Sequence, residues 1–134
     1  MQPKKQKYRK QFRGRRKGVS TRGSQVSFGE YGLKSLGRGW LSASQIEAAR
    51  RAISHTTRRG GKVWIRVFPD KPVTAKPSGV RMGGGKGEIQ KYVAVITPGR
   101  IIFELAGTSQ EIAKEALRRA AAKLPFAVRM VERQ

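Results

Sequence analysis

The sequence contains no cysteine and a single histidine, His55, among its 134 residues. Without cysteine, the chain forms no disulfide scaffold, no thiolate zinc site and no cysteine nucleophile. Long apolar runs are also missing, since no stretch approaches the roughly 18–20 residues that a membrane span needs. The first residues lack the apolar segment of a secretory signal. We therefore expect the protein to work where it is made.

Acidic residues are scarce as well, because 8 Asp and Glu stand against 30 Lys and Arg, which gives a formal net charge of +22. A compact protein with this charge repels itself unless a polyanion neutralises it. The polyanion could be nucleic acid, an anionic membrane surface or an acidic protein. A basic membrane-binding helix needs bulky apolar residues opposite its cations, and the first 22 positions offer only Tyr8, Phe12 and Val19. The charge therefore favours nucleic acid.

The cations are most concentrated at the N-terminus, where the first 22 residues hold ten basic side chains and no acid. Such an arm can be a solvated tail or a localisation signal. Tyr8 and Phe12 lie among its cations, however, as expected of a segment that folds on a nucleic acid by stacking as well as charge. The arm residues that we expect to contact RNA are Lys4, Lys5, Lys7, Arg9, Lys10, Arg13, Arg15, Arg16 and Lys17.

Two helices are predicted, each opened by a capping box. The first box pairs Ser44 with Glu47, and a glycine pair at 60–61 ends this helix. The second box pairs Thr108 with Glu111, and its helix ends before a proline. The residues expected on the buried faces are Ile46, Ala49, Ile53 and Thr57 in the first helix, and Ile112, Ala116, Leu117, Ala120 and Leu124 in the second.

Alternating or clustered apolar residues predict the strands. These are a short strand at 26–28, a strand at 62–69, a hairpin of 92–96 with 101–105, and a last strand at 126–131. The order predicts an α+β fold: a single compact domain with two helices packed on a mostly antiparallel or mixed sheet. We therefore divide the chain into a basic N-terminal extension, 1–23, and an RNA-binding domain, 24–134, with a long Gly- and Pro-rich loop at 70–88.

Nothing in the sequence forms a catalytic set. His55 lies on the polar side of the first helix beside arginines, and no nearby carboxylate in the sequence orients it. Helix capping and ion pairing explain Glu111 and Glu115. The sequence has no G-x-S-x-G elbow and no cluster of metal ligands. We predict no enzymatic activity, no small-molecule substrate, no cofactor and no metal.

The glycines at 83–85 invite comparison with a phosphate-binding loop. The motif fails, because Gly87 follows Lys86 where Ser or Thr would bind magnesium, and Val80 replaces the first glycine. Successive glycine amides still allow a phosphate to approach closely, with Arg81 and Lys86 adding positive charge. We interpret the segment as a flexible finger against a nucleic-acid backbone, the alternative being a merely mobile hairpin.

No helix-turn-helix, zinc finger, leucine zipper or aromatic RNA-recognition strand is evident. Dispersed arginines, a basic arm and a Gly-rich loop are typical of proteins that recognise the shape and phosphates of a large folded RNA. A free nucleic-acid chaperone or a nucleoid-type DNA protein would share the charge and the arm. A basic RNA-modifying enzyme would need a catalytic set that the sequence does not offer.

Two long segments resemble the signatures of the bacterial-type large-subunit ribosomal protein sixteen family. They are residues 58–69, RRGGKVWIRVFP, and residues 81–87, RMGGGKG, with Tyr92 five residues further on. The resemblance runs from Pro3 to about Pro125. Shorter segments that also fit the family are 26–29, 45–52, 68–72 and 121–125.

The resemblance implies a structural protein of the 50S-type subunit that binds 23S ribosomal RNA near the aminoacyl-tRNA site. It would lie close to the 5S ribosomal RNA and to neighbouring large-subunit proteins, and would join late in assembly. It would contact A-site tRNA and, as a second candidate, P-site tRNA. The expected location is cytoplasmic, in the ribosome, or the matrix or stroma of an organelle if the gene is organellar.

The resemblance also implies residue roles. The first signature supplies ribosomal-RNA contacts, and the second supplies the loop that approaches the peptidyl-transferase region. The basic face of the first helix is the candidate tRNA contact. The residues are Arg58, Arg59, Lys62 and Arg66 in the first signature, Arg81, Met82 and Lys86 in the second, and Arg50, Arg51 and His55 for tRNA.

Overall fold

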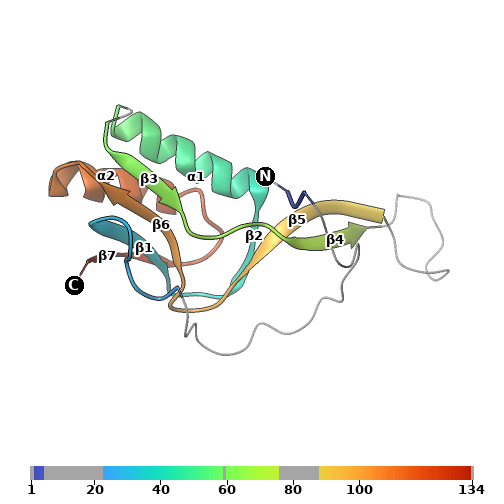
Figure 1. The fold of residues 1–134 in the computed structure, drawn as a ribbon. Coiled ribbons are helices and arrows are strands. Elements are labelled where there is room, and N and C mark those ends of the chain that lie inside the picture. The colour runs from blue at the N-terminus through green and yellow to red at the C-terminus, as the bar shows by residue number, and fades with distance from the viewer. Residues whose placement is uncertain (1, 5–22, 59, 76–87, 134) are drawn as a thin grey trace.

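The computed structural model describes residues 2–4, 23–58, 60–75 and 88–133. Within these residues the strands form a four-stranded sheet in the order β3-β6-β1-β7 and a three-stranded sheet in the order β2-β5-β4, with every pair antiparallel. The predicted α+β class is confirmed. The elements are β1 (Tyr31–Ser35), β2 (Gly39–Ser42), α1 (Ala43–Thr56), β3 (Lys62–Ile65), β4 (Lys71–Ala75), β5 (Glu88–Ile96), β6 (Ile101–Ala106), α2 (Gln110–Ala121) and β7 (Val128–Glu132) (Figure 1).

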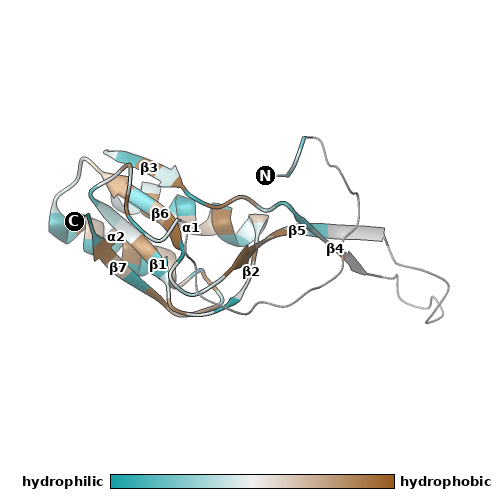
Figure 2. Cartoon of the chain, turned by 60° about the horizontal axis from the view of Figure 1, so that its bottom comes forward, coloured by the Kyte–Doolittle hydropathy of each residue, from teal (hydrophilic) through white to brown (hydrophobic). Residues whose placement is uncertain are grey.

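The core lies between the helices and one face of the four-stranded sheet (Figures 1 and 2). Leu33, Phe103 and Leu105 point to the helical side, and each is at most 2% exposed. The register pairs Leu33 with Phe103 across β1 and β6, so alternate residues of both strands enter this core. The other face of this sheet points away from the helices, and other segments of the chain can pack on it. None of the helices in the described ranges is long and apolar enough to cross a membrane.

Both helices begin at residues other than those predicted. Ser42, not Ser44, caps α1: its hydroxyl accepts the backbone N–H of Gln45 at 3.3 Å, and the Gln45 side chain accepts the N–H of Ser42 at 3.0 Å. Because Ser42 is also the last residue of β2, the chain passes directly from strand into helix. Ser109, not Thr108, caps α2: its hydroxyl accepts the backbone N–H of Ile112 at 3.3 Å. The predicted capping box of α2 is therefore wrong, because Ile112 has no side-chain acceptor that could return the hydrogen bond.

The predicted buried face of α1 is confirmed, since all four of its residues are buried. In α2 the prediction is wrong at Ile112, which is 44% exposed, while Ala113 is fully buried. The buried stripe starts at Ala113 and continues at i+3, i+4 and i+7 through Ala116, Leu117 and Ala120. Ile112 lies one position outside this stripe and therefore faces solvent.

The predicted hairpin is wrong, although both of its strands exist as β5 and β6. β5 pairs with β2 and β4, whereas β6 pairs with β1 and β3. The residues between β5 and β6 connect the two sheets. Within this connection, Gly99 donates its N–H to the carbonyl of Ser35 at 2.8 Å. Local alternation of apolar residues predicts a strand but does not select its partner.

The expected loop at 70–88 is also partly wrong, because residues 71–75 form β4. Pro72 lies opposite Tyr92 of β5, and β4 is an edge strand of its sheet. Proline has no backbone N–H to donate to a neighbouring strand. An edge strand tolerates this, because one of its sides has no partner strand. The remaining part of that loop, 76–87, lies outside the described residues.

Candidate nucleic-acid interface

The exposed side of α1 carries an open hollow of about 680 Å³. Its lining lies opposite the buried stripe of the helix, as the helical spacing predicts. We call this surface the α1 hollow. The structure thus brings the three residues predicted to contact tRNA together with one residue of the first signature; the lining residues are Arg50, Arg51, Ser54, His55 and Arg58.

The turn after α1 holds Arg58 at the rim of the hollow. Thr57 ends the helix, its N–H and its hydroxyl each donating to the carbonyl of Ile53 at 3.0 Å. Arg58 follows with φ of 54°, a left-handed conformation that is uncommon for a residue other than glycine. Gly61 has φ of 72°, and a Cβ there would lie 2.4 Å from the carbonyl oxygen of Ala106. The second glycine of the signature therefore lets this turn close against β6.

Glu47 pairs with two arginines of the α1 hollow, Arg50 and Arg51. Arg50 Nε donates to its Oε2 at 3.0 Å, and Arg51 Nε lies 3.3 Å from its Oε1. The hydrogen bond from Arg50, together with the charges of both arginines, lowers the pKa of Glu47 from 4.5 to about 2. Glu47 is therefore ionised at neutral pH and offsets part of the positive charge at the hollow.

The same arrangement recurs on α2. Glu115 Oε1 lies 2.8 Å from Arg118 Nη2 and 2.8 Å from Arg119 Nε, three and four residues further along the helix. The hydrogen bonds from Arg118 and Arg119 lower the pKa of Glu115 to about 2. The ion pairing expected of Glu115 is confirmed. Because α2 repeats the Glu-x-x-Arg-Arg spacing of α1, it provides an internal control for the α1 hollow.

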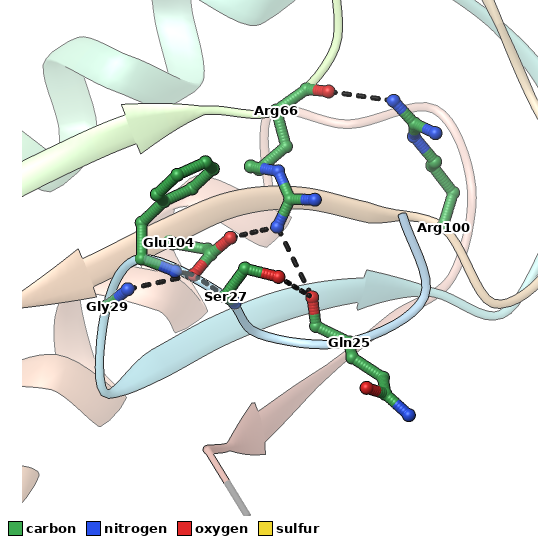
Figure 3. A network of polar contacts seen from close by, with 7 residues as sticks. Gln25, Ser27, Gly29, Arg66, Arg100 and Glu104 are labelled. Atoms are coloured by element: carbon green, nitrogen blue, oxygen red, sulfur yellow. Dashed lines mark hydrogen bonds and ion pairs between the residues drawn. The ribbon is translucent and has the colours of Figure 1, made fainter. Parts of the chain in front are cut away.

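A second polar centre lies on the opposite face of the four-stranded sheet, at Glu104 in β6. This side chain is fully buried. Its Oε1 accepts the backbone N–H groups of Ser27, Phe28 and Gly29 at 2.9, 2.7 and 2.9 Å, and its Oε2 forms an ion pair with Arg66 (Figure 3). The strand predicted at 26–28 is therefore wrong: the backbone donors of this segment bond to a carboxylate and not to a neighbouring strand.

The environment of Glu104 favours its charged form. Burial alone would raise the pKa of this carboxyl, but the N–H groups of Gly29 and Phe28 and the guanidinium of Arg66 outweigh it and hold the pKa below its usual value. Nothing in the sequence pattern marks this centre except a single carboxylate within an apolar strand. Its partners are 38 and 75–77 residues away along the chain.

Arg66 has a different environment from the other cations of the first signature. Its side chain is 16% exposed, and its Nη1 also donates to the carbonyl of Gln25 at 3.3 Å (Figure 3). These contacts connect Arg66 to the segment 25–29, which lies on this face of the sheet. Lys62, by contrast, is exposed on β3, as is Arg58 at the hollow. Arg66 is therefore held within the fold, whereas the side chains of Lys62 and Arg58 are accessible to solvent.

Several predicted contact residues are not part of the described structure. Lys4 is described and is exposed. The contacts expected of the remaining arm and of the loop are predictions that rest on the sequence. The residues outside the described ranges are Lys5, Lys7, Arg9, Lys10, Arg13, Arg15, Arg16, Lys17, Arg59, Arg81, Met82 and Lys86.

The model of one protein family, described as ribosomal protein L16p/L10e, matches residues 3–131 of this chain. The match begins in the basic arm and ends in β7, so it spans nearly the whole sequence. It includes every residue that lines the α1 hollow and every residue of the Glu104 centre.

Proposed function

Because the chain belongs to the ribosomal protein L16p/L10e family, we propose that it binds 23S ribosomal RNA near the aminoacyl-tRNA site and contacts A-site tRNA through the α1 hollow. Members of this family are structural constituents of the large ribosomal subunit and not enzymes. The protein is accordingly a ribosomal protein that binds ribosomal RNA and other ribosomal proteins. The family resemblance drawn from the two signatures is confirmed.

The convergence of cations on the α1 hollow carries the tRNA part of the proposal. Apart from Arg58, which we assign to ribosomal RNA, its lining offers two guanidinium groups, an imidazole and a hydroxyl, all of which can donate hydrogen bonds to phosphate oxygens. Arginine presents two N–H groups in a planar fork that matches a phosphate. The hollow is also open to solvent along α1, as binding to the backbone of a large RNA requires.

The overall charge supports the ribosomal-RNA part. If about 8 of the 30 cations pair with phosphates, the logarithm of the affinity falls by roughly 5–7 for each tenfold rise in salt. Specificity then comes from RNA shape, because the major groove of A-form RNA is too narrow for side chains to read. We assign the arm, Arg58 and Lys62 to ribosomal RNA.

The proposal also covers the position of the protein within the subunit. The protein joins the subunit late in assembly and lies near the 5S ribosomal RNA, with P-site tRNA as a second tRNA partner. The loop around Arg81, Met82 and Lys86 approaches the peptidyl-transferase region. The location is the cytoplasmic ribosome, or the ribosome of an organelle if the gene is organellar.

Changing Glu47 to glutamine tests the charge balance of the hollow. Since Glu47 is ionised and pairs with Arg50 and Arg51, Glu47→Gln removes one negative charge beside the proposed phosphate contacts. We expect subunits that carry this variant to bind A-site tRNA severalfold more tightly at low salt, with a log–log salt slope steeper by up to about one. The matched change on α2, Glu115→Gln, should leave tRNA binding unaltered. An equal gain in tRNA affinity in both variants would mean that binding depends on the net charge of the protein and not on the α1 hollow.

Co-sedimentation with large subunits tests the ribosomal assignment. A protein embedded in the subunit stays with the 50S particle through a high-salt wash, whereas a free chaperone or a nucleoid-type DNA protein dissociates. We expect this chain to remain with the particle. Quantitative release at moderate salt would overturn the proposal in favour of a nonspecific polyanion binder.

A further inference from the structure

Two stacked aromatic rings with a cation at each end lie on the sheet face that is turned away from the helices. Lys62 and Trp64 occupy alternate positions of β3, so their side chains share one face. Lys62 Nζ is 5.4 Å from the centre of the Trp64 ring, and Phe28 stacks beside Trp64 with ring centres 6.1 Å apart and planes 22° apart. The guanidinium carbon of Arg66 lies 5.1 Å from the centre of the Phe28 ring. We call these four side chains the stacking row.

The fold holds Phe28 in this row by contacts to its backbone. The N–H groups of Phe28 and of its two neighbours bond to the Glu104 carboxylate, which also pairs with Arg66 (Figure 3). Two glycines allow the segment to lie flat on the sheet: a Cβ on Gly29 would lie 2.8 Å from the carbonyl oxygen of Leu105, and one on Gly32 would lie 2.8 Å from Val26 Cγ2. The position of Phe28 is therefore fixed mainly through its backbone, while more than half of the residue stays exposed.

Phe28 is 57% exposed although its backbone is anchored. Burying an aromatic ring is favourable, so a rigidly held and exposed one indicates a surface that a partner covers. The flanking cations identify the partner, because an acidic polymer with flat aromatic groups satisfies both the rings and the charges. Proteins that bind single-stranded nucleic acid combine aromatic rings and cations in this way.

We infer that Phe28, backed by Trp64, is a platform on which one unpaired base of RNA stacks, with Lys62 at the adjacent phosphate. Arg66 positions the platform through its contacts to Glu104 and to the Phe28 ring. This inference rests on the proposed RNA binding and adds the kind of RNA element: a base that is free of a partner strand and can be turned outward. A purely apolar protein surface would cover the rings but would leave the cation of Lys62 without a counter-charge.

The test compares two short strands of equal length and charge, an oligoadenylate and an abasic oligonucleotide, in binding to the full-length protein at low salt. The wild type should bind the oligoadenylate more tightly than the abasic strand, because stacking of one base contributes roughly five- to a hundredfold in affinity. Phe28→Leu should remove most of this preference and leave the affinity for the abasic strand unchanged. Phe28→Tyr should retain it.

Phe68→Leu is the matched control, since Phe68 is an exposed phenylalanine, 48% accessible, outside the stacking row. It should bind both strands as the wild type does. The inference is overturned if Phe28→Leu lowers both affinities equally, changes neither, or behaves as Phe68→Leu does. Its failure is separate from that of the proposed function, because retention of the wild type on washed 50S particles does not depend on the Phe28 variants.

Discussion

Replacing Glu104 with alanine is expected to lower the free energy of unfolding by about 3–5 kcal/mol, as the loss of one partner of a buried ion pair does. The change leaves the guanidinium of Arg66 and three backbone N–H groups without their acceptor. Because the total stability of a domain is about 5–15 kcal/mol, much of it would be lost. Urea denaturation followed by circular dichroism measures the effect.

Two further variants show whether the buried contacts cause this effect. Glu104→Gln keeps the size of the side chain and one acceptor oxygen, so it should be less destabilising than Glu104→Ala. Glu115→Ala removes an exposed carboxylate that also pairs with two arginines, and its urea midpoint should change little. If Glu104→Ala had the same urea midpoint of unfolding as the wild type, the structural role of this centre would be contradicted.

The depressed pKa of Glu104 adds a pH dependence with a definite sign. A carboxyl whose pKa is lower in the folded than in the unfolded protein stabilises the fold fully above its ordinary value of 4.5. This contribution is lost as the pH falls through the lower pKa of the folded state. Glu47 and Glu115 act in the same direction, so the difference between wild type and Glu104→Gln isolates Glu104. That difference should shrink as the pH falls below 4.5.

Replacing Arg50 and Arg51 together with alanine is expected to weaken A-site tRNA binding by about tenfold or more, while incorporation into the large subunit remains nearly normal. Both arginines line the α1 hollow and face away from the core of the domain. The loss of two phosphate contacts should also reduce the log–log salt slope by up to about two. Filter binding of aminoacyl-tRNA to reconstituted ribosomes at several salt concentrations measures both quantities.

The double change Arg118→Ala and Arg119→Ala on α2 is the control. It also removes two positive charges and two ion pairs with a glutamate, but at a site outside the α1 hollow. Its tRNA affinity should equal that of the wild type. Normal tRNA affinity of the Arg50 and Arg51 variant, combined with poor incorporation into subunits, would overturn the assignment of the hollow to tRNA.

The features of this fold that are local in the sequence could be predicted from it. Helical spacing correctly predicts the buried face of α1, and with it the exposed face that carries Arg50, Arg51 and His55. The caps are displaced by one or two residues because each helix start offers two hydroxyl residues, Ser42 and Ser44 or Thr108 and Ser109, and spacing in the sequence does not choose between them. Patterns of this kind place an element more reliably than its end.

The features that depend on distant contacts could not be predicted. Adjacent strands β5 and β6 resemble a hairpin in sequence, yet each completes a different sheet. The role of Glu104 depends on a segment about 75 residues earlier in the chain, which lies beside it in the fold because β1 pairs with β6. The stacking row has the same origin, because Phe28 and Trp64 come from different segments and meet on one sheet face.

A chemical footprint of ribosomal RNA in 50S particles, with and without this protein, shows whether it binds at one defined site. Protection should be confined to the RNA around the aminoacyl-tRNA site and on the side of the 5S ribosomal RNA, and it should persist at high salt. Diffuse protection that disappears at moderate salt would contradict this prediction, because the charge of +22 would then act on RNA without a defined site.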